Sequence, residues 1–534
     1  MAITAVAGPY PDAPPYDPGE AYPEYGERPR SASPNPVYAA VRETLRRLGY
    51  DRERYGTPEW NPLGTIVRPG DRVFLKPNLV AHASRTKGRE SDDLFAVITH
   101  PAVVRALGDY VAIALKGRGE LIVGDNPSID ADFSRILERT HLDRLPALYA
   151  ERFGVFCRVL DLRPLRTDDL EYYGFKSRAV PQQGDPDGEL VVDLGPRSRF
   201  FGLNPWRFRG AFSNRLETIR LHHGRTHRYS LSATVALSDV FISVPKLKAH
   251  HKVGVTLNLK GLVGTVANKN CLVHWQIGYP GWGGDEYSQT VTATDHLRLA
   301  LEHLLLDALP ESVYLALRGV IRRHRRAPSQ KGKPGGTGGT GKPAHEKYRG
   351  AWPGNDTCWR MVADLYDALV VDVTGYRQRQ GKGPMRFFSL VDGVTAGEGD
   401  GPFTPTSREA RVLLAGEDLL AVDCVATRTM GFRLEQVRYL SRLAEERGLR
   451  PSTIRVISDE FPSSNRLDAT ERHLAFQPPT KWPELALPRP KDTGDEDHHS
   501  RGRQGRTPDA PHEEHPQAAP RPRPWSDPAG RTDR

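Results

Sequence analysis

Residues 244–260 hold the densest group of side chains in this chain that could do chemistry. An apolar run that predicts a strand leads into lysines and histidines, and a glycine and a threonine then precede a helical pattern. Ammonium groups beside a helix N-terminus suit a carboxylate or a phosphate, and a histidine among them can move a proton near neutral pH. The simpler alternative is a solvated strand end with two loop histidines. We predict that Lys246, Lys248, Gly254, Thr256 and Asn258 bind the substrate and that His250 and Lys260 are catalytic.

Two further predicted strands end in polar residues. Lys76 and Asn78 follow the apolar residues 73–75, and Asp125 follows residues 121–124. Ligands of open α/β sheets bind beyond the carboxyl ends of the strands, so we expect Lys76 and Asn78 to bind substrate and Asp125 to be catalytic. Three roles stay open for Asp125: it could orient a base, hold a metal or cap the following turn.

A divalent metal is the cofactor that the remaining acidic and imidazole groups could hold. Asp392 and Glu398 lie in a glycine-rich stretch, and His274 follows the central helical pattern. These three residues are the predicted metal ligands, although acids in polar loops also serve solubility alone. The cysteines at 157, 271, 358 and 424 form no CxxC pair, so no cysteine-bound iron–sulfur cluster is expected.

The charge of the chain is concentrated in one segment. Formal net charge is +9, and residues 322–349 hold nine basic residues against one glutamate. This segment has little aromatic content, so nucleic acid is an unlikely partner. No signal peptide and no apolar run long enough for a membrane span are visible, and the unpaired cysteines suit a reducing compartment, so we expect a cytoplasmic protein without a membrane partner.

Short β-rich runs alternate with helical patterns between residues 73 and 458, and the predicted helices include residues 101–115, 296–318 and 419–430. This alternation predicts an α/β fold with a mostly parallel or mixed sheet flanked by helices. Composition divides the chain into a Pro/Tyr-rich tail (1–36), an α/β catalytic-like domain (37–475) and a Pro/Arg-rich tail (476–534). We expect both tails to be disordered and the Gly/Lys-rich segment 322–350 to be a flexible basic insertion.

Several short strings together resemble the domain-of-unknown-function 362 family over residues 70–435. The resemblance implies an α/β fold and leaves the reaction open. Some relatives carry ferredoxin-like cysteine clusters, which this chain lacks, so no electron-transfer role follows. The strings are Lys76-Pro-Asn-Leu79, Thr99-His-Pro101, Val123-Gly-Asp125, Pro245-Lys-Leu-Lys-Ala-His250, Asp392-Gly393, Ala421-Val-Asp423 and Met430-Gly431.

A second similarity is to the nickel-pincer lactate racemases. Their central turn has a histidine, a glycine four residues later and a lysine ten residues later, which His250, Gly254 and Lys260 match. The resemblance implies that the histidine transfers a proton and that the lysine tethers the cofactor. The glycines before that lysine are replaced here by Leu257-Asn-Leu259, so no nickel cofactor is inferred.

The leading hypothesis is an enzyme that acts on a small anionic metabolite carrying a carboxylate or a phosphate. Lys246, Lys248 and Lys260 would hold the anion, and His250 would move a proton in an isomerase or racemase reaction, with Asp125, Asp392 or Glu398 orienting it or a metal. The alternative is a protein that binds an anionic ligand or nucleic acid without catalysis. A weaker third hypothesis is a scaffold that docks partners through its Pro-rich ends. The sequence leaves the oligomeric state open.

Overall fold

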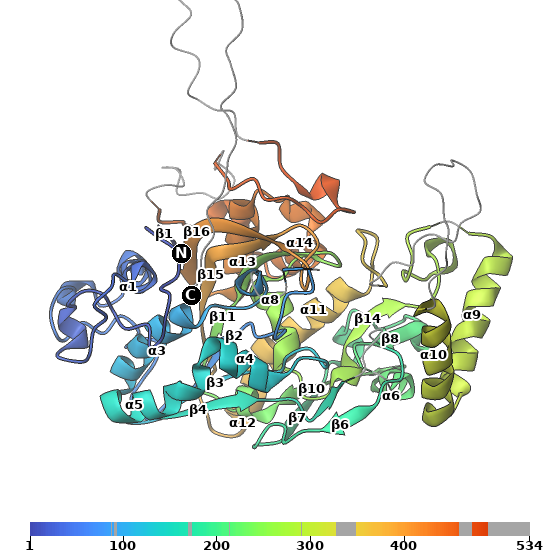
Figure 1. Cartoon of the computed structure of the whole chain (residues 1–534), viewed down its shortest axis with the longest axis horizontal. Coiled ribbons are helices and arrows are strands. Elements are labelled where there is room, and N and C mark those ends of the chain that lie inside the picture. Colours follow the sequence, from blue (N-terminus) through green and yellow to red (C-terminus); the bar gives the residue numbers. More distant parts are fainter. Residues whose placement is uncertain are drawn as a thin grey trace, which may run out of the picture. The chain divides into compact units, whose positions relative to one another are not determined.

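A mixed β-sheet runs through the molecule in the computed structural model, in the order β1-β16-β15-β11-β2-β3-β4 (Figure 1). The neighbours from β15 to β4 are parallel, and β16 is antiparallel to both β15 and β1. The predicted α/β fold with a mostly parallel or mixed sheet is therefore confirmed. The strands are β1 (Ala2–Ala5), β2 (Arg72–Pro77), β3 (Glu120–Asp125), β4 (Phe156–Asp161), β11 (Val240–Val244), β15 (Arg386–Glu398) and β16 (Thr406–Gly416).

The structure describes residues 1–86, 88–89, 93–168, 174–212, 214–289, 291–326, 349–458 and 472–489. All of them lie in one unit, Met1–Pro490. In this part of the chain no helix combines the length and the apolarity that crossing a bilayer requires.

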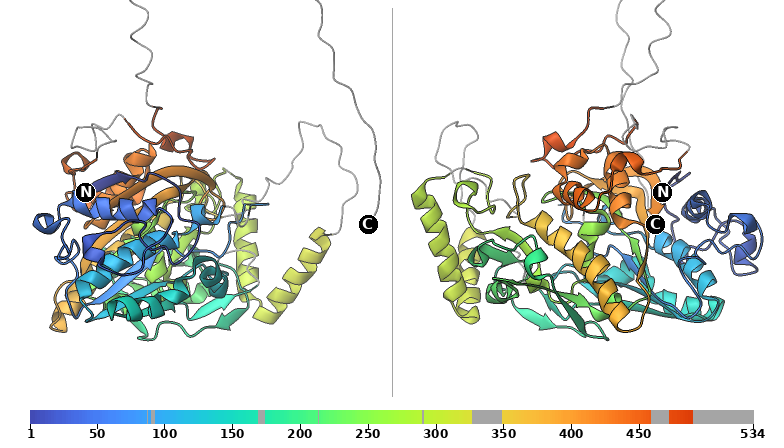
Figure 2. Two further views of the ribbon diagram at one scale, coloured as in Figure 1. Left: turned by 60° about the vertical axis from the view of Figure 1, so that its left-hand side comes forward. Right: turned by 180° about the vertical axis from the view of Figure 1, so that it is seen from behind.

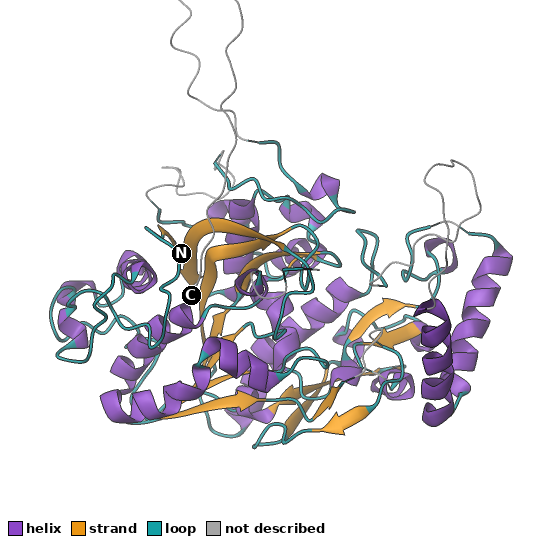
Figure 3. Cartoon of the chain, in the orientation of Figure 1, coloured by secondary structure: helices purple, strands orange, loops and turns teal. Residues whose placement is uncertain are grey.

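Helices cover both faces of the sheet (Figures 1 and 3). Successive strand residues point to opposite faces, so in β2 Val73 and Leu75 belong to one core and Phe74 to the other. The first core is covered by α1 (Pro36–Leu48), α3 (Pro101–Leu115) and α5 (Leu145–Phe153). The second is covered by α8 (Leu257–Gly261), α11 (Cys358–Tyr366), α13 (Leu419–Met430) and α14 (Arg438–Glu446).

Short strands and helices extend the fold beside the main sheet (Figure 2). Strand β12 continues β11 and pairs with β15 and with β13, and the other short strands form sheets of their own. The additional strands are β5 (Leu165–Thr167), β6 (Ala179–Pro181), β7 (Glu189–Asp193), β8 (Phe208–Gly210), β9 (His222–His223), β10 (Thr226–Ser232), β12 (Lys246–His250), β13 (Gly254–Val255) and β14 (Val273–Gln276). The additional helices are α2 (Leu94–Val97), α4 (Phe133–Thr140), α6 (Arg215–Leu221), α7 (Ala233–Ala236), α9 (Ala293–Ala308), α10 (Glu311–Arg326) and α12 (Val373–Arg379).

The N-terminal residues 1–36 differ from the disordered tail that their composition predicts. Strand β1 pairs with β16, and Tyr16, Tyr22 and Tyr25 are buried. The tyrosines supply the apolar area that the average composition of the segment conceals. The prediction for this tail is therefore wrong.

The C-terminal boundary also differs, because Phe476, Trp482 and Leu485 are buried in the main core. The folded unit thus extends beyond the predicted end at 475, while residues 490–534 lie outside the described residues. Of the predicted basic insertion, residues 322–326 end α10 and residues 327–348 lie outside the described residues.

Candidate functional site

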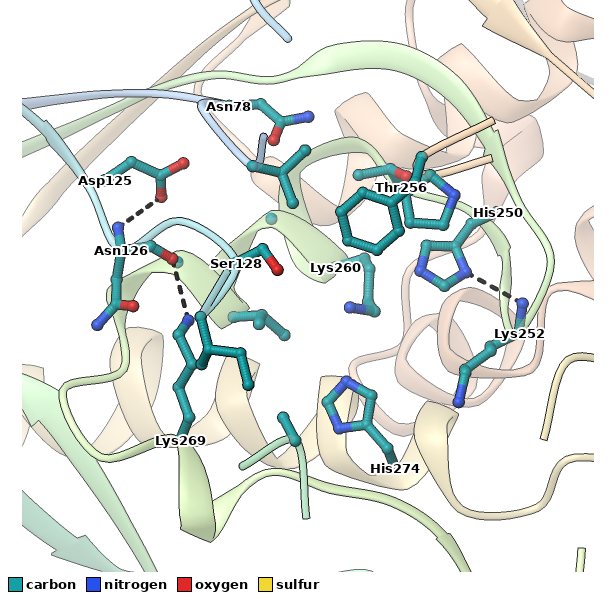
Figure 4. Close-up of a pocket in the computed structure, with 18 of the residues that line it drawn as sticks. Asn78, Asp125, Asn126, Ser128, His250, Lys252, Thr256, Lys260, Lys269 and His274 are labelled. Atoms are coloured by element: carbon teal, nitrogen blue, oxygen red, sulfur yellow. Dashed lines mark hydrogen bonds between the residues drawn. The ribbon is translucent and has the colours of Figure 1, made fainter. Parts of the chain in front are cut away.

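A pocket of about 370 Å³ opens where the carboxyl ends of β2 and β3 meet β12 and α8 (Figure 4). Its volume suits a small metabolite. Eight of the predicted site residues line it: Lys76, Asn78, Asp125, Lys248, His250, Thr256, Lys260 and His274. The structure therefore brings together three strand ends and the central helix that lie far apart in the sequence.

Cations dominate the lining of this pocket. Asp125 and Asp130 are its two carboxylates among the described residues, and each is already in an ion pair, with Lys76 (2.7 Å) and with Arg85 (2.5 Å) respectively. The basic lining residues are Lys76, Arg85, Lys248, Lys252, Lys260, Lys269 and Arg349. The lining residues thus include more basic than acidic groups, which favours a negatively charged occupant.

Asp125 fastens two of the strand ends to each other. Its carboxylate accepts hydrogen bonds from the backbone N–H groups of Leu79 (2.7 Å) and Asn126 (2.9 Å) in addition to the Lys76 ion pair. A Cβ on Gly264 would lie 2.0 Å from Asp125 Oδ1 and 2.7 Å from Lys76 Nζ, so only glycine allows this approach. Of the three roles open to Asp125, capping of the following turn is the one that these contacts support.

The N-terminus of α8 does not face the pocket as an open anion cradle. The buried carboxylate of Asp423 accepts the backbone N–H groups of Asn258 (2.9 Å) and Leu259 (2.8 Å) and the Asn258 side chain (2.8 Å). Burial nevertheless raises the pKa of Asp423 to about 7. Asn258 therefore belongs to an internal cap, and its predicted contact with substrate is not part of this arrangement.

Lys248 is buried in β12 and its ammonium group donates to the Val97 carbonyl at 2.6 Å. Burial, with Lys246 and Lys260 nearby, holds the pKa of Lys248 well below its usual value. Lys269 is buried too and donates to the Asn126 carbonyl at 3.0 Å, and burial lowers its pKa to about 7. Both lysines would bind a proton more tightly once an anion entered the pocket.

His250 and His274 both use Nδ1 for a backbone contact, and their Nε2 atoms differ in protonation. His250 Nδ1 accepts the backbone N–H of Lys252 (3.0 Å), which places the ring proton of the neutral imidazole on Nε2. His274 Nδ1 lies 2.9 Å from the Leu272 carbonyl and must donate to it, which leaves Nε2 as an unprotonated acceptor. Burial, followed by the charge of Lys260, lowers the pKa of both imidazoles well below the usual value, so both are neutral near pH 7.

Three polar atoms of the lining residues have no hydrogen-bond partner among the described residues, Thr256 Oγ1, Asn126 Oδ1 and Trp275 Nε1. All three residues are buried, and an unsatisfied buried polar atom costs about 1–3 kcal/mol. A ligand that hydrogen-bonds to them would recover this free energy.

Lys246 and Asp392 lie outside the pocket and pair with each other at 2.9 Å in the fully buried interior. The Tyr10 hydroxyl donates to Asp392 Oδ1 (2.6 Å), and Lys246 donates to the same hydroxyl (2.7 Å). The backbone N–H of His100 donates to Asp392 Oδ2 (2.9 Å). The structure thus gives Lys246 and Asp392 structural contacts in place of the predicted substrate and metal contacts.

The predicted metal ligands are not brought together. Glu398 pairs with Arg408 (2.9 Å) and accepts the Gln477 N–H (2.9 Å), while His274 lines the pocket. Across the described ranges, no cluster of three or more His, Cys, Asp or Glu side chains suits a metal ion. Gly254, with φ of +88°, serves the turn between β12 and α8, where a Cβ would press against Val437.

Sequence reasoning missed several cations of the pocket. Lys269 lies in a short turn after α8, and Arg349 is the last basic residue of the segment 322–349, so neither stands at the end of a predicted strand. Arg85 comes from the loop after β2, seven residues beyond the predicted Asn78. The Asn-Lys-Asn string at 268–270 was the available signal for Lys269, because asparagines favour turns that bring a side chain inward.

Fold and site together define an α/β protein with a cation-lined pocket at the carboxyl ends of parallel strands. Residues 204–428 match the family model described as "Domain of unknown function (DUF362)", which agrees with the resemblance noted in the sequence and covers a shorter span than 70–435. A thylakoid-associated protein of Synechocystis sp., sll1697, is 25% identical over 207 residues, which cover 39% of this chain and 43% of the relative. The chain thus spans less than half the length of this relative. No solved structure matches it.

Proposed function

We propose that the protein is an enzyme that binds a small metabolite carrying a carboxylate or a phosphate in the cation-lined pocket and transfers a proton on it. The observation that carries the proposal is the charge balance of the lining. Three of its seven basic side chains, Lys76, Arg85 and Arg349, are paired with carboxylates, whereas Lys248, Lys260 and Lys269 have no carboxylate partner among the described residues. An anion that enters the pocket would supply the missing counter-charge and favour the protonated forms of these three lysines.

The two imidazoles supply the acid–base groups of this proposal. The free Nε2 of His274 is the proton acceptor, and Nε2–H of His250 donates a hydrogen bond to an oxygen that gains negative charge. This division moves the proton-transfer role from His250, where the sequence places it, to His274. Abstraction and return of a proton next to a carboxylate is isomerase or racemase chemistry, and none of these roles requires a metal.

The alternative is a protein that binds the same anion without turning it over. The pocket volume of about 370 Å³ favours a small ligand over nucleic acid. A cytoplasmic location fits the proposal, because the four cysteines are buried and unbridged.

Proton exchange tests the enzyme against the binder. Short 2-hydroxy and 2-oxo carboxylates are incubated with the protein in D₂O, and loss of their carbon-bound protons is followed by NMR. We expect exchange with the unchanged protein and its loss in His274→Asn, while the control His223→Asn, at the exposed residue of β9, retains it. Sulfate binding without exchange of any compound would support the binder, and absence of both would overturn the anion site.

A further inference from the structure

Lys260 differs from the other lysines of the pocket in its contacts. Lys76 pairs with Asp125, Lys248 donates to Val97, and Lys269 donates to Asn126. Lys252 donates to the Arg349 carbonyl. In the described part of the chain, the Lys260 amino group has no hydrogen bond and no ion pair, although the residue is only 8% exposed. A buried ammonium group normally has acceptors, so the Lys260 ammonium gives up its proton more readily than an exposed lysine does.

The surroundings of Lys260 are those of an activated nucleophile. Figure 4 shows its side chain extending into the pocket between the rings of His250 and His274. Lys260 is also the charged neighbour with the largest effect on both imidazoles, which agrees with that placement. Burial lowers the pKa of Lys260 itself, and the neighbouring Cys358 thiol is held neutral by its own burial.

We propose that Lys260 forms a Schiff base with the carbonyl carbon of a small 2-oxo acid, and that His274 transfers the protons of this step. The inference rests on the proposed function and narrows its substrate class to anions in which a ketone or an aldehyde adjoins a carboxylate. The neighbouring cations, Lys248 and Lys252 foremost, hold the carboxylate, and Thr256 Oγ1 is available to the oxygens of the substrate.

Each proton of the step can be followed. His274 Nε2 takes a proton from the Lys260 ammonium, the amine adds to the carbonyl carbon, and the proton passes to the former carbonyl oxygen. His274 then takes a second proton from the nitrogen and returns it to the hydroxyl, which leaves as water as the C=N bond forms. The nitrogen keeps one proton, so ammonium and carbonyl become a protonated imine and water. His250 Nε2–H donates to the oxygen throughout.

Formation of the imine would make the proposed proton transfer easier. A protonated C=N bond next to a carboxylate withdraws electrons from the adjoining carbon, whose proton then becomes acidic enough for a neutral imidazole to remove. The same base, His274, serves both steps because its Nδ1 is fixed by the Leu272 carbonyl and its Nε2 stays free.

Reductive trapping tests the inference. The full chain is incubated with glyoxylate, pyruvate or 2-oxoglutarate, sodium borohydride is added, and the labelled lysines are mapped by peptide mass spectrometry. Hydride reduces the imine to a stable secondary amine at the lysine that formed it. We expect labelling of Lys260 about tenfold or more above that of the exposed Lys382, with loss of this label in Lys260→Arg and unchanged labelling in the control Lys382→Arg.

A second variant and a binding measurement separate the possible failures. His274→Asn should slow the labelling of Lys260 by about tenfold or more and leave sulfate affinity within about twofold, because it removes proton transfer and leaves the cations in place. Label on Lys269 or on surface lysines without enrichment at Lys260 overturns the inference. Binding of sulfate and 2-oxo acids without any trapped imine also overturns it and leaves the proposed anion site standing, whereas failure of both to bind overturns the two together.

Discussion

Lys246 and Lys260 are both buried lysines of the same central segment, and they lie in opposite electrostatic settings. Lys246 donates to Asp392 and to Tyr10, so its charge is matched inside the core. Lys260 has neither kind of contact among the described residues and lies between two neutral imidazoles at the wall of a pocket. A buried cation that is paired with an anion stabilises the fold, whereas a buried cation without an anionic partner attracts a negatively charged ligand.

The two partners of Lys246 come from distant parts of the chain. Tyr10 is contributed by the N-terminal segment and Asp392 by β15, and the Tyr10 ring stacks on His100 with centroids 3.8 Å apart. This cluster ties the N-terminal segment to the strand that carries Lys246 and Lys248. The N-terminal segment therefore supports the site without lining it.

The largest expected effect is on stability and comes from breaking the ion pair between Lys246 and Asp392. Asp392→Ala leaves the Lys246 ammonium and the Tyr10 hydroxyl without their acceptor in a fully buried place, and we expect the free energy of unfolding to fall by about 3–5 kcal/mol. Urea denaturation measures this loss. The double variant Lys246→Met with Asp392→Leu should regain much of it, and a single variant as stable as the unchanged protein would contradict the comparison.

Removing the Lys260 ammonium group should weaken anion binding and leave the free energy of unfolding unchanged. Lys260→Met deletes a charge that no described residue compensates, so we expect no loss in the free energy of unfolding. Sulfate binding should weaken by about 1.5–3 kcal/mol, which is the contribution of one hydrogen bond to a charged group. Calorimetric titration of Lys260→Met beside Lys382→Met, an exposed control, measures it, and equal affinities would place the anion elsewhere.

Substitution of Lys269 should have a smaller effect on anion binding, and this effect should depend on pH. Burial lowers its pKa to about 7 in the free protein, with Asp125 acting against the burial and Arg163, Lys260 and Lys76 adding to it. An anion favours the protonated form and raises this pKa, so affinity is fully present below pH 7 and falls as pH rises above it, by up to about tenfold per pH unit. Sulfate, whose charge is constant there, is a suitable probe between about pH 6 and pH 9.

The control for this pH effect is Lys269→Met. It should bind sulfate more weakly at pH 6 and show a shallower dependence on pH, because the other lining cations remain. A slope unchanged by the substitution would assign the titrating group to another residue.

The sequence predicted the elements that repeat regularly and missed contacts made over long distances. Helices α3 and α13 lie at the predicted residues 101–115 and 419–430, because each has a sustained apolar pattern and an N-cap side chain, from His100 and Asp418. One predicted helix over 296–318 is instead split into α9 and α10 around Pro310, which cannot continue a helix.

For the site, strand ends were a good guide to position and a poor guide to role. The rule that ligands bind at the carboxyl ends of strands placed Lys76, Asp125, Lys248 and His250 at one pocket. It could not say that Asp423, on α13, would occupy the N–H groups of α8, because that contact joins residues far apart in the sequence. The tautomers of His250 and His274 likewise depend on carbonyl and amide groups that only the folded backbone supplies.

Substitution of Glu398 should have the smallest effect on stability, because the ion pair of this residue is partly exposed. It pairs with Arg408 at a partly exposed position away from the pocket, in contrast to Asp392 in the same strand, β15. Exposed pairs contribute about 0–1 kcal/mol, so Glu398→Gln should lower the free energy of unfolding by no more than that and leave sulfate affinity unchanged. Titration of both proteins with Mg²⁺ or Mn²⁺ should show no binding that depends on Glu398, because its carboxylate already accepts Arg408 and the Gln477 N–H. Metal affinity lost on substitution would instead restore the role that the sequence suggested for Glu398.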